Sequence, residues 1–357
     1  MKRNILAFAV AALSALPLAS YAEGPTFYGK IDASLERIDV DGEGDSFGVN
    51  DNNSRIGLKG EEDLGALTGF YQAEFEINIT DRESGEDGIF KTRNTFVGLK
   101  GDYGQVFVGT FDTPFKESQN KIDLYSDQQD MAQYIAGEER LRSQIGYRTP
   151  DMNGLVGFIS FKPGEREEDN AGEIQDGIAD SYSAMVAYQT DMFYLAAAYD
   201  GNVAWGFWED TPFSLDDADE GQESYSDGIR LVGALTMDMW GAGLLLQQGE
   251  ENDDPNPAEQ VSAVLSGYFK VDQTKFELQY GQSAHEVETA SAAASSDDVD
   301  IDFIGLGIEQ QLSERTMVYA ILASITTDRE SSVEVGGLTA PTETDTKVAM
   351  VGAQHKF

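Results

Sequence analysis

The chain has 357 residues, of which 64 are acidic and 24 are basic, so its formal net charge is −40. This acidic excess excludes nucleic acid as a partner, because affinity for phosphates comes from Lys and Arg, and it is also typical of proteins adapted to high salt. The sequence contains no cysteine, which excludes a disulfide framework and a thiolate metal site.

The first 22 residues have the pattern of a secretory signal. A basic pair, Lys2-Arg3, precedes an apolar stretch at 5–18, and Ser20-Tyr21-Ala22 forms a small-x-small cleavage site before Glu23. No other run reaches the roughly 20 apolar residues of a transmembrane helix. We therefore expect an exported protein, cleaved near Ala22, whose residues 23–357 form one domain without a helical anchor.

Beyond Glu23, strand-like runs alternate with two kinds of connection. Eight connections are long and rich in Asp, Glu, Gly and Ser: 40–52, 81–91, 113–141, 164–178, 201–225, 250–259, 286–298 and 328–345. Seven are short, and most carry the residues of tight turns: 61–65, 101–104, 149–154, 190–191, 237–241, 271–274 and 312–315. Fifteen connections imply an all-β fold of sixteen antiparallel strands. Long loops at one end and tight turns at the other are typical of a transmembrane barrel of the bacterial outer membrane.

Within these runs, polar and apolar residues alternate with the period of a strand. In residues 70–79 the odd-numbered side chains are apolar while Gln72, Glu74, Glu76 and Asn78 share the other face, and in residues 316–325 the odd-numbered side chains again align. A water-soluble sandwich would show the same alternation. A porin-sized barrel instead turns its polar face toward a wet lumen. The terminal Phe357, whose ring we expect at the bilayer interface and whose strand closes the barrel during assembly, favours the barrel together with the signal and the even strand count.

At this point the residues resemble a known family, the trimeric general porins of Gram-negative outer membranes, over essentially the whole length after the signal. The resemblance is carried by short segments in a specific order and spacing: Phe27–Lys30, Ser54–Gly65, Gly69–Glu76, Arg93–Gly101, Gly104–Gly109 and Val351–Phe357. It implies a sixteen-stranded barrel assembled as a homotrimer in outer-membrane lipid and lipopolysaccharide, with the third long loop folded into the lumen. The Pro-Glu-Phe-Gly-Gly tract of the enteric subgroup's constriction loop is missing here.

The resemblance also implies a pore constriction in which loop acids face a ladder of wall bases. The third long connection, Thr113–Leu141, is also the longest, and a connection of this length in a compact domain is usually functional. By matching positions, the bases are Lys30, Arg55, Arg93, Arg142 and Arg148. The candidate acids are those that the loop itself carries, Glu117, Asp123, Asp127 and Asp130, together with Glu74, which lies on the polar face of its predicted strand. Which loop acid points at the bases stays open at this stage.

Three functions are compatible with these features. The favoured one is a channel for passive diffusion of small hydrophilic solutes and ions; the alternatives are a sugar-specific or oligosaccharide-specific channel and a non-conducting structural or adhesive barrel. The acidic excess predicts a preference for cations. We predict no enzyme, cofactor or metal centre, because His285 and His355 are the only histidines and neither pairs with a nucleophile in a recognisable site. We expect His285, at the edge of an acidic loop, to be exposed, and Trp205 and Trp208 to lie in the fifth loop rather than along the pore.

Overall fold

The computed structural model describes residues 24–80, 90–129, 131–164, 167–168, 174–205, 224–252, 257–287, 298–329, 334–335, 338–339 and 343–357. The predicted signal and its cleavage site lie outside these residues. Within the described ranges, no helix is both long and apolar enough to cross a membrane.

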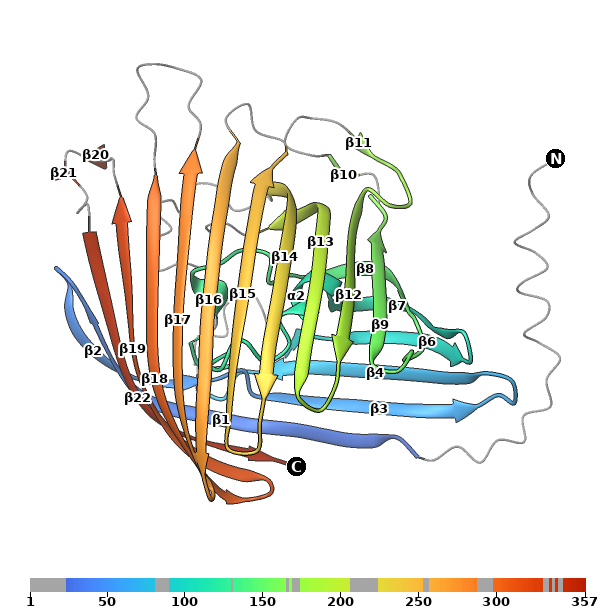
Figure 1. Ribbon diagram of the computed structural model, residues 1–357, viewed down its shortest axis with the longest axis horizontal. Helices are drawn as coiled ribbons and strands as arrows, with labels where there is room; N and C mark the ends of the chain where they lie inside the picture. Colours follow the sequence, from blue (N-terminus) through green and yellow to red (C-terminus); the bar gives the residue numbers. More distant parts are fainter. Residues whose placement is uncertain are drawn as a thin grey trace.

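In the described part of the chain, sixteen antiparallel strands form the wall of a closed barrel, as the connections predicted, and two short strands, Gly44–Asp51 and Phe90–Thr92, extend the same sheet. Their bounds are β1 Thr26–Val40, β3 Arg55–Asp63, β4 Thr68–Ile77, β6 Thr95–Gly101, β7 Gly104–Asp112, β8 Arg140–Arg148, β9 Leu155–Lys162, β12 Ser181–Gln189, β13 Phe193–Trp205, β14 Ser224–Thr236, β15 Trp240–Glu251, β16 Ala258–Val271, β17 Thr274–Val287, β18 Val299–Ser313, β19 Thr316–Arg329 and β22 Glu343–Lys356. In Figure 1, β12–β19 stand side by side, and β1, β3 and β4 run across their direction.

The first and last strands close the barrel. β1 pairs with β22 from Lys30↔Lys356 to Val40↔Thr346, and with β3 on its other side. Phe357 and Gly29 exchange two backbone hydrogen bonds of 3.0 and 3.1 Å. The Phe357 ring centroid lies 5.8 Å from that of Phe27. Closure satisfies backbone groups that an open edge would leave unpaired in lipid.

Shorter elements extend the wall or lie between its strands. They are β2 Gly44–Asp51, β5 Phe90–Thr92, β10 Glu167–Glu168, β11 Ile174–Gln175, β20 Glu334–Val335 and β21 Leu338–Thr339, with the helix α2 at Pro114–Ser118 and the 3₁₀ turn η1 at Met131–Gln133. Two predicted loops are therefore shorter than expected. β2 folds back on β1 where the sequence indicated a connection at 40–52, and β13 continues to Trp205, which is buried. In both places the chain keeps pairing beyond the bounds that polar composition suggested.

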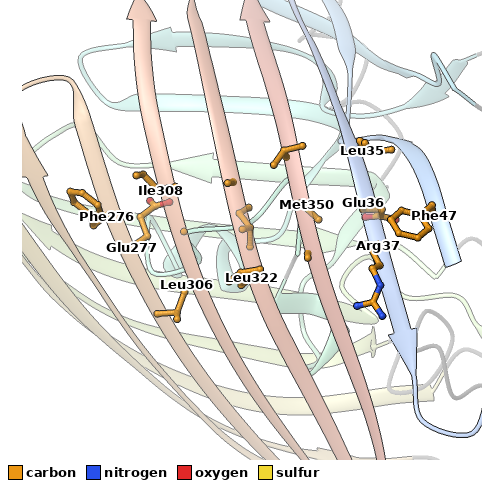
Figure 2. Close-up of a pocket in the computed structure, with 15 residues that line it drawn as sticks. Leu35, Glu36, Arg37, Phe47, Phe276, Glu277, Leu306, Ile308, Leu322 and Met350 are labelled. Atoms are coloured by element: carbon orange, nitrogen blue, oxygen red, sulfur yellow. The ribbon is translucent and has the colours of Figure 1, made fainter. Parts of the chain in front are cut away.

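The outward faces of the strands are apolar and exposed, as expected of a surface in contact with lipid. A groove of about 810 Å³ lies on this surface. Its lining residues in Figure 2 include Leu35 and Phe47 of β1 and β2 and Leu306 and Leu322 of β18 and β19. The groove extends from the β1–β2 hairpin across β22 to β18 and β19.

The inward face is less polar than the sequence predicted. The odd-numbered residues of 317–325 do share a face, but Ile321 and Ile325 are buried with Phe303 and Met350 in one apolar cluster inside the barrel. Residues of the β7–β8 connection complete this cluster, so this part of the wall is covered by protein rather than by water. His285 is also an exception to the prediction, because it is only 3% exposed and contacts Ser283 on the inward face of β17.

Candidate functional site

The connection between β7 and β8 packs against inward-facing side chains of the strands that follow it. Near its start, the backbone amide of Phe115 donates a 3.0 Å hydrogen bond to Ser183 Oγ of β12. Further along, the amide of Leu124 donates a 2.7 Å bond to Gln279 Oε1 of β17. The two contacts lie on well-separated strands, so the connection packs against the wall from β12 to β17.

Two tyrosines attach the middle of this connection to β18. The ring of Tyr134 stacks on Phe303 with centroids 4.8 Å apart and planes at 11°, and the Tyr125 centroid lies 6.3 Å from the same phenylalanine. A Cβ at Gly281 would lie 2.2 Å from Tyr134, and one at Gly305 would lie 2.5 Å from Tyr125. Glycine at these positions therefore lets both rings approach the sheet. Burial raises the pKa of the Tyr125 hydroxyl, which stays neutral.

A buried ion pair holds the end of the connection. Arg230 Nη1 of β14 lies 2.6 Å from Glu138 Oε1, and the two side chains are 0% and 3% exposed. The guanidinium also donates hydrogen bonds to Gln247 Oε1 at 2.8 Å and to Phe115 O at 3.2 Å. The sequence reasoning missed Arg230. The available signal was strand alternation, which turns the even-numbered residues of 226–232 inward.

The turn at 125–129, called here the loop tip, contacts β1 and β3. Asp127 lies 2.6 Å from Lys30 Nζ and 3.2 Å from Arg55 Nη1. The next residue, Gln128, donates a 3.2 Å hydrogen bond to Asp32 Oδ2. Three residues proposed from the sequence, Asp127, Lys30 and Arg55, therefore meet in one cluster, and Asp127 is the loop acid that reaches the first two bases.

A second group of charges lies on the wall from β4 to β8. Arg93 contacts Glu74 Oε1 at 3.0 Å and Glu76 Oε2 at 3.1 Å. Arg140 Nη2 lies 2.9 Å from Asp112 Oδ1. Arg93 and Glu74 were candidates from the sequence, whereas Arg140 and Asp112 were not. Their position in the sequence could have indicated them, because Asp112 and Arg140 stand at the two ends of the long connection, where β7 and β8 pair.

The remaining candidate bases take different positions. Arg148 pairs with Glu117 of α2, and its guanidinium carbon lies 4.2 Å from the centroid of the Phe158 ring. Arg142 is exposed, and no ion pair is found for it within the described residues. It precedes Ser143, whose φ of 55° interrupts the alternation of β8. The structure therefore brings Arg148, but not Arg142, to a carboxylate of the connection.

Asp123 organises the connection from inside. Its carboxylate accepts hydrogen bonds from the backbone amides of Tyr125 at 3.1 Å and Met131 at 3.0 Å, and from Gln279 Nε2 at 3.0 Å. With all three donors, the buried carboxylate fixes the fold of the loop tip rather than facing the wall bases. The candidate Asp130 lies outside the described residues.

The charges around the loop tip and the β4–β8 wall nearly balance. In the described part of the chain this constriction group consists of five cations and six carboxylates: Lys30, Arg55, Arg93, Arg140 and Arg148 with Asp32, Glu74, Glu76, Asp112, Glu117 and Asp127. All except Lys30 and Asp32 keep between 12% and 33% of the side chain exposed. The constriction group therefore combines paired charges, one excess negative charge and contact with solvent.

Another acidic group, missed from the sequence, lies on the inward face of β17 and β18. Lys275 Nζ contacts Glu277 Oε1 at 2.6 Å and Glu309 Oε2 at 2.7 Å. One ammonium group thus serves two carboxylates.

Comparison with known proteins adds independent information. The family described as Gram-negative porin matches residues 9–330. The chain is 29% identical over 339 residues to the major outer membrane protein P.IB of Neisseria meningitidis serogroup B, covering 88% of this chain and 91% of that protein. Among solved structures, an anion-selective porin from Comamonas acidovorans superposes with a TM-score of 0.70 at 22% identity, covering 94% and 99% of the two chains. The trimer form of OmpT, an outer membrane protein of Vibrio cholerae, has a TM-score of 0.64 at 16% identity and covers 94% and 99%.

Proposed function

Because the chain belongs to the Gram-negative porin family, we propose that it forms a water-filled channel through which small hydrophilic solutes and ions diffuse passively across the outer membrane. The constriction group carries this proposal. Its paired charges remain partly exposed on the inward side of a barrel whose outward side is apolar, which is the arrangement of a wet lumen.

The β7–β8 connection narrows this channel. It is attached through Arg230 and Gln279 to strands on one side and through Asp127 to β1 and β3 on the other. The remaining passage runs between the connection and the β4–β8 wall, where the exposed members of the constriction group lie. Rings of fixed charge at such a narrowing set the selectivity of a pore.

We further propose that the channel prefers cations, most strongly in dilute salt. Within the described part of the chain, four of the five ladder bases, Lys30, Arg55, Arg93 and Arg148, are paired with carboxylates, which leaves Arg142 as the one ladder base without an ion pair. The constriction group and the β17–β18 group each contain one more carboxylate than cations, and the formal net charge of the whole chain is −40. Such a potential concentrates cations and is screened over about 10 Å at 0.1 M salt. The anion selectivity named for the Comamonas protein belongs to that protein, whose 22% identity supports the shared fold.

A homotrimer in outer-membrane lipid and lipopolysaccharide is the proposed assembly. Membership of the porin family and the trimer form of the Vibrio cholerae protein support it. Electrophoresis of unboiled protein should give a folded species near three times the monomer mass, and a folded band of monomer mass alone would contradict the trimer.

Planar-bilayer recording tests the channel and its selectivity. The protein is expected to give stable conductance steps, and a KCl gradient should give a reversal potential on the cation side that declines as total salt rises. Protein that inserts without conducting would refute the channel. A reversal potential on the anion side in dilute KCl would show that the bases dominate despite their partners.

A further inference from the structure

The carboxylate of Asp32 is completely buried at the centre of a hydrogen-bond network. It lies on the inward face of β1 with 0% exposure. Tyr319 Oη donates to its Oδ1 at 2.7 Å, and Gln354 Nε2 donates to its Oδ2 at 2.7 Å. A buried carboxylate is tolerated only where donors or cations compensate for lost hydration. These two donors come from β19 and β22, so the wall itself fixes the position of Asp32.

The same carboxylate contacts both attachments of the loop tip to β1. Gln128 Nε2 donates directly to Asp32 Oδ2 at 3.2 Å. Lys30 Nζ, which lies 2.6 Å from Asp127, is also 3.5 Å from Asp32 Oδ2. Asp32 therefore binds Gln128 of the loop tip directly, and it also orients the Lys30 ammonium group that binds Asp127.

We propose that Asp32 is a positioning residue of the constriction, which fixes the loop tip against β1 and so sets the width of the passage. This inference rests on the proposed channel function. The pairing of β1 with β22 depends on backbone hydrogen bonds over residues 30–40, so the barrel does not need this carboxylate for closure. The contact of Asp127 with Arg55 is independent of Asp32 and should keep the tip near the wall but less restrained.

The matched control lies four residues further along the same strand. Glu36 is also an inward, buried carboxylate, at 5% exposure, but its hydrogen bond is to Asn50 rather than to the connection. Asp32→Asn and Glu36→Gln each remove one negative charge from the lumen. At 1 M salt the Debye length is about 3 Å, so differences in conductance between them then report geometry rather than charge.

A nitroxide label at the loop tip gives a readout independent of conduction. Ser126 is exposed and the chain has no cysteine, so Ser126→Cys provides one labelling site. A hydrogen bond to a charged acceptor biases an equilibrium by roughly tenfold or more. We expect a comparable rise in the mobile fraction of the label, together with greater open-channel noise in 1 M KCl, in Asp32→Asn and in Gln128→Ala, and wild-type behaviour in Glu36→Gln.

Each result decides the inference. Label mobility unchanged in Asp32→Asn and Gln128→Ala, or equally increased in Glu36→Gln, would overturn it. If Asp32→Asn does not fold, as judged by heat-dependent electrophoretic mobility, Gln128→Ala in the connection supplies the decision. A wild-type protein that never conducts would refute the channel, while the label comparison would still decide whether Asp32 positions the tip.

Discussion

Replacing Arg230 with methionine removes the cation from a buried ion pair while keeping an unbranched side chain in its place. Glu138, which is 3% exposed, then loses the guanidinium that lies 2.6 Å away. Breaking a buried pair by removing one partner typically costs about 3–5 kcal/mol. This loss should destabilise the attachment of the connection near Ala136 and Glu138 rather than the barrel, because the pairing of the strands remains intact.

Hydrogen exchange measures that loss directly. The amide of Ala136 donates a 3.1 Å hydrogen bond to Gln260 Oε1, so it exchanges only when this part of the connection detaches. A change of about 3–5 kcal/mol corresponds to roughly 10²- to 10³-fold or more faster exchange, at 1.36 kcal/mol for each factor of ten. Peptides covering residues 134–139 should show the change in Arg230→Met, and peptides from β16–β18 should not.

The double variant Arg230→Met/Glu138→Leu is the control. Replacing both members of a buried pair with apolar residues is often neutral or stabilising, so protection at Ala136 should return close to that of the wild type. Wild-type exchange in Arg230→Met alone would refute the reasoning, because it would mean that the buried carboxylate is compensated without its cation.

Three further predictions concern selectivity, the connection and assembly. Asp127→Asn should shift the reversal potential toward anions in 0.1 M KCl and less at 1 M, because it leaves Lys30 and Arg55 without their shared carboxylate; an unchanged potential would remove Asp127 from the selectivity mechanism. Asp123→Asn should instead loosen the connection by about 1–3 kcal/mol, seen as faster amide exchange of Met131 at unchanged selectivity, because its carboxylate accepts bonds within the connection. Deleting Phe357 should lower the yield of folded protein in the outer membrane, because its two backbone bonds to Gly29 help to close the barrel; wild-type yield would contradict that role.

Some of the constriction could be anticipated because the resemblance to porins named the wall bases and strand alternation fixes which way a side chain points. Lys30, Arg55 and Arg93 lie on the inward side of the wall, where a charge avoids lipid. Alternation also indicates that Asp32 and Arg230 point inward. It does not indicate which of the inward residues contact the β7–β8 connection. Arg142, which was proposed from the resemblance, is exposed, and the irregular backbone at Ser143 breaks the period there.

The connection itself has no period, so its residues could be proposed only as a set. Asp123 and Asp127 are four residues apart in similar sequence surroundings, yet one binds backbone amides inside the connection and the other binds two wall cations. The difference depends on how the turn at 125–129 folds and on which strands it meets. Neither is encoded in local composition.

By itself, the sequence determined the sixteen strands and their order, because these follow from period-2 alternation and turn residues that act over a few positions. Only the tertiary structure decided the partners of the charges. Asp32 and Gln354 are separated by 322 positions, and Asn52 and Tyr319 by 267. Such pairs form where barrel closure and the path of the β7–β8 connection bring distant segments within hydrogen-bond distance, and no local pattern records that distance.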